Sequence, residues 1–109
     1  MDQQILEQIK KEIAANRIVL FTKGTKEAPM CGFSARTIAV FKELGRPFKT
    51  IDILPDPRIR QTLSAYSNWP TVPQVFINGK FIGGCDIVTE MHQKGELQPV
   101  VEEAFKSQA

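Results

Sequence analysis

The dipeptide Asn78-Gly79 constrains the fold of this chain more than any other feature of its sequence. A tight two-residue β-hairpin turn needs positive φ at both central positions, and Asn followed by Gly meets that need best. Short β-rich segments flank the dipeptide, Gln74 to Ile77 before it and Lys80 to Ile82 after it. The sequence therefore predicts an antiparallel pair of strands in the second half of the chain, which excludes an all-helical fold.

The first half of the chain alternates between helical and strand-like segments. Apolar residues at helical spacing predict a helix over about 2–15. The short, β-rich run 17–22 predicts a buried strand, and residues 23–30, with a glycine and a proline, predict a loop. A helix is then expected from 32 to a Gly and Pro stop signal, followed by a strand over 48–53.

Three more helices complete the pattern. Asp56-Pro57 is typical of a helix start, because Asp caps the first turn and Pro suits the first helical position. Asp86 is expected to cap a helix that ends near Gly95, and apolar spacing predicts a last helix from Leu97 to Phe105. The first two strands flank a helix and should be parallel, with a right-handed crossover. These elements predict an α/β fold with a four-stranded mixed sheet flanked by helices, as a single domain over 1–109.

Composition and charge narrow the classes of function. The chain has 109 residues and a net charge of +2, with 14 basic and 12 acidic residues, which is too balanced for nucleic acid as the main partner. No apolar run approaches the ~20 residues of a membrane span. The N-terminal segment is charged and periodic, unlike a signal peptide. We therefore expect a cytoplasmic protein that binds neither nucleic acid nor membrane.

Cys31 is the strongest candidate for chemistry. The chain has two cysteines and one histidine, too few for a disulfide scaffold or for a zinc site within one chain. Cys31 lies where a loop gives way to a helix, and a thiol at a helix N-terminus can have its pKa lowered to ~3.5–7.5. Its thiolate would be both nucleophile and metal ligand; the alternative is a small buried hydrophobic residue.

Four motifs in register resemble those of the monothiol glutaredoxins, which have a thioredoxin fold. Cys31-Gly32-Phe33-Ser34 is similar to the CGFS signature of that family. The other three are Lys23-Gly24, Trp69-Pro70-Thr71-Val72-Pro73 and Gly83-Gly84-Cys85-Asp86. The resemblance runs from about Ile5 to Phe105. One departure is Lys26, where many relatives carry proline, and it leaves the rigidity of the loop open.

The resemblance implies a glutathione site. Lys23 and Arg60 would bind the glycine carboxylate, and the backbone of Val72, before a cis Pro73, would pair with the cysteinyl unit. Asp86 and the N–H groups around it would take the γ-glutamyl end. The cofactor-binding residues implied are Lys23, Phe33, Arg60, Thr71, Val72, Pro73, Gly84, Cys85 and Asp86. Solvated surface roles stay open for Lys23 and Arg60, a packing role for Trp69, and either a groove position or a disulfide with Cys31 for Cys85.

The resemblance also implies an iron–sulfur function. Cys31 from each chain of a homodimer and one thiolate from each of two glutathiones would supply the four sulfur ligands of a [2Fe–2S] cluster. BolA-like proteins and apo iron–sulfur acceptors are the implied partners. Because Ser34 cannot form a disulfide with Cys31, an alternative function is a glutathione-dependent oxidoreductase that removes glutathione from protein thiols. A third hypothesis is a redox sensor that uses Cys31 and Cys85.

Overall fold

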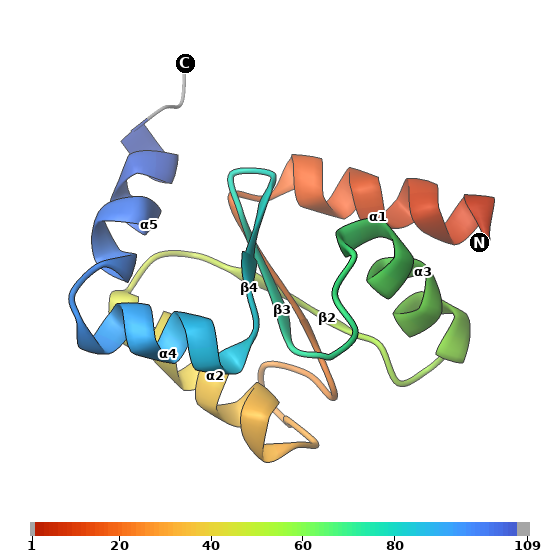
Figure 1. Cartoon of the computed structure of the whole chain (residues 1–109), viewed down its shortest axis with the longest axis horizontal. Coiled ribbons are helices and arrows are strands. Elements are labelled where there is room, and N and C mark those ends of the chain that lie inside the picture. The colour runs from red at the N-terminus through yellow and green to blue at the C-terminus, as the bar shows by residue number, and fades with distance from the viewer. Residues whose placement is uncertain (1, 107–109) are drawn as a thin grey trace.

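The structure is a computed structural model that describes residues 2–106 (Figure 1). The helices are α1 (Gln3–Ala15), α2 (Gly32–Leu44), α3 (Pro57–Ser67), α4 (Cys85–Gln93) and α5 (Leu97–Lys106). The strands are β1 (Ile18–Thr22), β2 (Lys49–Asp52), β3 (Gln74–Ile77) and β4 (Lys80–Gly83). Among the described residues no helix is long and apolar enough to cross a membrane.

The four strands form one mixed sheet, as the sequence predicts, and their order in it is β2-β1-β3-β4. β1 pairs in parallel with β2 and antiparallel with β3, and β4 returns antiparallel to β3. Asn78 and Gly79 have φ values of 53° and 81°, so the turn between β3 and β4 uses the conformation that this dipeptide favours. The hairpin prediction is confirmed.

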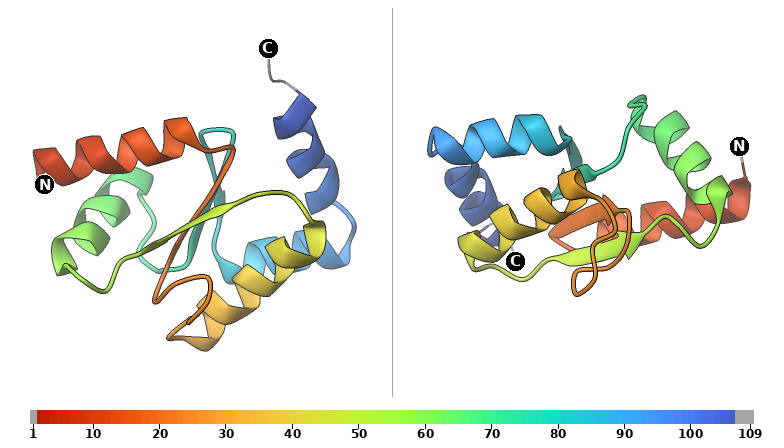
Figure 2. Two further views of the ribbon diagram at one scale, coloured as in Figure 1. Left: turned by 180° about the vertical axis from the view of Figure 1, so that it is seen from behind. Right: turned by 90° about the horizontal axis from the view of Figure 1, so that it is seen from below.

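Helices cover both faces of the sheet. The two views of Figure 2 place α1 and α3 together on one side and α2, α4 and α5 on the other. Successive residues of β1 point to opposite faces: Ile18 and Leu20 pack in the core with α2, α4 and α5, whereas Val19 and Phe21 pack in the core with α1 and α3. Burial of β1 on both faces explains why its sequence is apolar without alternation.

Of the two helix caps that the sequence predicts, the one at α3 is confirmed and the one at α4 is not. The Asp2 carboxylate accepts the backbone N–H of Ile5 at the start of α1, and the Asp56 carboxylate accepts that of Arg58 at the start of α3. The prediction that Asp86 caps α4 is wrong. The cap position is Gly84, because the chain turns into the helix directly after β4, and Asp86 lies inside the first turn. Its carboxylate is exposed there, beside the positive end of the helix dipole.

Gly24, directly after Lys23, is sterically required at the end of β1. Its φ is +88°, and a Cβ atom there would lie 2.4 Å from the Ala28 carbonyl oxygen and 2.6 Å from the Met30 nitrogen. We expect Gly24→Ala to lower the free energy of unfolding by about 2–3 kcal/mol, through overpacking and an unfavourable φ. Urea denaturation would measure it. Gly32→Ala is the matched control: a Cβ on Gly32 would meet no atom within 4 Å, so a similar loss there would contradict the explanation.

Candidate functional site

Cys31 lies at the N-cap position of α2, partly exposed, with an extended backbone. The backbone N–H of Ser34 contributes most to lowering the pKa of the Cys31 thiol below its ordinary value, and partial burial opposes it. The N–H of Phe33, the Ser34 hydroxyl and the charge of Lys23 lower this pKa further. A larger share of the thiol is therefore ionised at neutral pH than in a free cysteine, and the thiolate is the form that attacks disulfides and binds metals.

Ser34 connects the cysteine to the end of β1. Its side chain is fully buried, and its Oγ accepts the backbone N–H of Lys23 at 3.1 Å. The hydroxyl proton is then available to the Cys31 sulfur, in line with the effect of this hydroxyl on the thiol pKa. Ser34 therefore has a structural role as well as an electrostatic one, and both depend on a hydroxyl at this position.

The loop between Lys23 and Cys31 is tied to strand β2. The Gly24 N–H donates to Asp52 Oδ1 at 2.9 Å, and the Lys26 N–H donates to Thr50 Oγ1 at 3.1 Å. The Lys26 ammonium donates to the Phe48 carbonyl at 2.6 Å and lies 4.1 Å from the centre of the Phe48 ring. The presence of Lys26 in place of proline leaves the rigidity of the loop open in the sequence. In the structure, Lys26 is one of the residues that hold the loop in place.

A cleft of about 370 Å³ lies next to the start of α2: Lys23 and Phe33 line it, whereas Cys31 is not among its lining residues. All nine residues that the resemblance implies for glutathione line it, so the structure brings together residues from the β1 loop, α2, α3, the 69–73 segment and α4. Trp69 and Ile87 complete the lining. The sequence left packing open for Trp69 and missed Ile87. The sequence signal for Ile87 is its place directly after Asp86 in the same helical turn; its exposure as a large apolar residue is visible only in the structure. Which of these residues bind a ligand stays a prediction.

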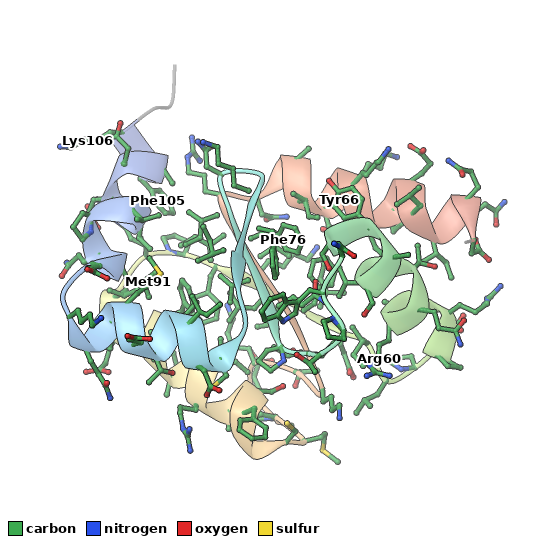
Figure 3. All side chains as sticks on the ribbon, in the orientation of Figure 1. Arg60, Tyr66, Phe76, Met91, Phe105 and Lys106 are labelled. Carbon is green, nitrogen blue, oxygen red and sulfur yellow. The ribbon has the colours of Figure 1, made fainter. Side chains whose placement is uncertain are left out.

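The cleft offers groups of both charges to a zwitterionic ligand. Lys23 and Arg60 are cationic, and the Arg60 Nη2 donates to the Pro70 carbonyl at 3.2 Å. Figure 3 shows Arg60 extending from α3 on the side of the molecule where α2 begins. Asp86 supplies a carboxylate, and the first turn of α4 supplies backbone N–H groups that favour an anion. At Gly84 a Cβ would lie 3.2 Å from the Pro73 carbonyl oxygen, so a side chain would crowd the wall there.

Cys85 and Pro73 form neighbouring parts of the same wall. The peptide bond between Val72 and Pro73 is cis, as the resemblance implies. Both cysteines are free thiols; Cys85 is buried, and its sulfur lies 3.8 Å from Thr89 Oγ1. Cys85 therefore lines the cleft as a reduced thiol in this structure, and its pairing with Cys31 under oxidation stays an untested prediction.

The fold and this site define the chain as a thioredoxin-fold protein in which a partly exposed thiol of lowered pKa, that of Cys31, starts a helix next to a cleft. Residues 18–82 match the sequence profile of the family described as Glutaredoxin. A Synechocystis protein named "Uncharacterized monothiol glutaredoxin ycf64-like" is 47% identical over 107 residues, which cover 98% of this chain and 100% of that protein. This protein belongs to the glutaredoxin family, and its relatives in sequence include proteins named as monothiol glutaredoxins.

Solved structures agree with this assignment. Reduced apo GrxS14 from poplar is 46% identical, with a TM-score of 0.83 over 93% of each chain. The buckwheat glutaredoxin–glutathione complex is 33% identical, with a TM-score of 0.83 over 94% of this chain and 91% of that one. The thioredoxin fold predicted from the sequence is confirmed.

The Ser34 hydroxyl should set part of the reactivity of Cys31. We expect Ser34→Ala to raise the pKa of Cys31, because it removes one donor to the thiolate but keeps the Ser34 backbone N–H, the largest contribution. Fewer thiolates at neutral pH mean slower alkylation by iodoacetamide, and the rate profile should move to higher pH. Thr37→Val, which removes another buried α2 hydroxyl, bonded to the Phe33 carbonyl, is the control. An unmoved Ser34→Ala profile would refute this role.

Proposed function

We propose that this protein binds glutathione and, as a homodimer, carries a [2Fe–2S] cluster to apo acceptor proteins. The cluster is the cargo, and glutathione supplies the ligands that the protein lacks. Two chains would provide one Cys31 thiolate each, and two glutathiones one thiolate each. BolA-like proteins are proposed as further partners in iron–sulfur assembly and iron homeostasis, and the cytoplasm as the compartment.

The observation that carries this proposal is the isolation of the Cys31 thiol. It is partly exposed at a helix N-terminus, and its pKa is lowered. The other cysteine, Cys85, is buried in α4, and Ser34 takes the place where a resolving cysteine would stand. A [2Fe–2S] cluster needs four protein or external ligands, so a chain that offers one accessible thiolate requires a second chain and external thiols.

The cleft supports glutathione as the external thiol. Lys23 and Arg60 suit the glycine carboxylate, and a charged hydrogen bond of this kind is worth ~1.5–3 kcal/mol. The N–H groups at the start of α4 suit the γ-glutamyl carboxylate, and Asp86 suits its ammonium. The Val72 backbone suits the cysteinyl unit, which would place the glutathione sulfur toward Cys31. The buckwheat structure is named as a glutathione complex, which supports the same ligand here.

Stoichiometry tests the cluster hypothesis directly. We expect anaerobic reconstitution with iron, sulfide and glutathione to give about two chains per [2Fe–2S] cluster, because four sulfur ligands are needed. Light scattering with iron and sulfide analysis would measure it. Cys31→Ser should fold and lose the cluster, and native protein without any thiol is the second control. A monomeric loaded protein, or full assembly without thiol, would contradict the model.

The alternative function is a glutathione-dependent oxidoreductase. It requires a faster rate of disulfide turnover than the carrier function does. In that reaction a second glutathione thiolate attacks the glutathione sulfur of the Cys31 mixed disulfide, releasing oxidised glutathione and the Cys31 thiolate. A carrier needs glutathione only as a ligand. The backbone of Lys23 is held by Ser34, and Lys26 ties the loop that follows it to Thr50 of β2. We infer that this restricted backbone places Lys23 for binding glutathione as a ligand rather than for turnover.

We expect slow turnover in a glutathione-coupled disulfide reduction assay and efficient cluster donation to an apo ferredoxin. Shortening the loop 24–29 should raise turnover, because Lys23 would take a new position. Ser34→Cys should raise turnover less than shortening the loop does, since glutathione already resolves the mixed disulfide. A dithiol glutaredoxin is the reference for rate. Equal turnover without cluster donation would favour the oxidoreductase.

A further inference from the structure

Gln74 is a fully buried polar residue that does not line the cleft. It is the first residue of β3, and it pairs with Phe21 of β1. Its side chain shares a sheet face with Phe76, the face covered by α1 and α3; Figure 3 shows Phe76 at this face, below Tyr66 of α3. An uncharged amide in such a place destabilises the fold unless it forms hydrogen bonds.

The amide of Gln74 holds the segment that forms one wall of the cleft. Its Nε2 donates to the carbonyl oxygens of Trp69 and Thr71, each at 3.1 Å. Both neighbours are carbonyls, which only accept, so they fix which end of the amide faces them. The Oε1 atom has no hydrogen-bond partner in the structure, so the amide contributes through its two donors.

Alternate carbonyls of this wall have different hydrogen-bond partners. Those of Trp69 and Thr71 turn inward to Gln74, whereas the carbonyl between them, on Pro70, accepts a hydrogen bond from the exposed Arg60. Two hydrogen bonds from one rigid amide therefore set the rotation of the backbone just before Val72. The same backbone rotation leaves the Pro70 carbonyl free to accept the hydrogen bond from Arg60.

We propose that Gln74 is a positioning residue for glutathione: its two donors orient the 69–72 backbone so that Val72 faces the cysteinyl unit of the ligand. This inference rests on the proposed function, because it needs glutathione to pair with Val72. It assigns a binding role to a residue that contacts no ligand. Gln74 acts from behind the wall, through carbonyls that face away from the cleft.

A graded series at position 74 tests the number of donors. Native Gln74 has two donors, Gln74→Glu keeps one when its buried carboxyl is protonated, and Gln74→Met keeps none at similar volume. Calorimetry with S-methylglutathione as the probe should give affinities that fall in that order. Gln74→Met should bind about three- to tenfold less tightly than the native protein, which is the effect of losing one neutral hydrogen bond between Val72 and the ligand. Thr62→Val, a buried polar residue of α3 outside the cleft, is the control for general loss of stability.

A modified ligand separates positioning from folding. S-methylglutathione that is also N-methylated at its cysteinyl amide cannot donate to the Val72 carbonyl, so it should bind native protein about three- to tenfold less tightly. In Gln74→Met this difference between the two ligands should shrink, since the carbonyl is no longer held in place. A purely structural role would lower both affinities equally and leave the ratio unchanged.

The outcomes distinguish two kinds of failure. If native protein binds both ligands equally, Val72 does not pair with glutathione, and the proposed binding mode fails together with this inference. If native protein discriminates and Gln74→Met discriminates to the same extent, the binding mode stands and the role of Gln74 is refuted. Hydrogen exchange of the Val72 amide, faster in Gln74→Met than in Thr62→Val, is the expected supporting result; equal exchange would oppose the proposal.

Discussion

The burial of β1 on both faces is the constraint on which the rest of the structure depends. Ile18 and Leu20 pack into one core and Val19 and Phe21 into the other, so a shift by one residue would exchange the two sets. Neighbouring strands occupy both edges of β1. The chain that leaves β1 therefore starts from a fixed place, and Lys23 is its first residue.

Buried or half-buried side chains then hold the backbone that forms the site. Ser34 accepts the N–H of Lys23, Asp52 accepts that of Gly24, and Gln74 donates to two carbonyls of the 69–73 segment. None of these three residues lines the cleft. A ligand that meets backbone groups needs them oriented in advance, because ordering them on binding would lower the affinity.

Residue patterns predicted most of the fold for physical reasons that act locally. Asn78-Gly79 favours one turn, Asp56-Pro57 favours a helix start, and the apolar run of β1 fits burial on both faces. The cap of α4 was mispredicted, because Asp86 is a good cap in isolation but the exit from β4 gives that position to Gly84. At this helix start, the geometry of the preceding strand outweighs the preference of Asp for the N-cap position.

The sequence motifs predicted most of the residues that line the cleft. They did not predict the residues that hold this lining in place. Gln74 begins a strand of apolar residues, and nothing in its spacing tells that its amide meets two carbonyls of a preceding loop. Lys26 similarly looks like a solvated loop lysine until the Phe48 carbonyl and ring are seen beside it. Partners distant in sequence create both roles, so only the three-dimensional structure identifies them.

Ligand binding and thiol exchange place opposite demands on this arrangement. Both begin with the Cys31 thiolate, which the start of α2 stabilises. Ligation requires the glutathione sulfur to stay beside that thiolate, which a fixed wall and a fastened loop favour. Exchange requires a second sulfur to approach in line with the first bond, which needs space at the opposite side of the bound sulfur. We propose that a site in which Lys26, Ser34 and Gln74 all restrict the backbone holds glutathione as a ligand rather than exchanging it, as the proposed carrier function requires.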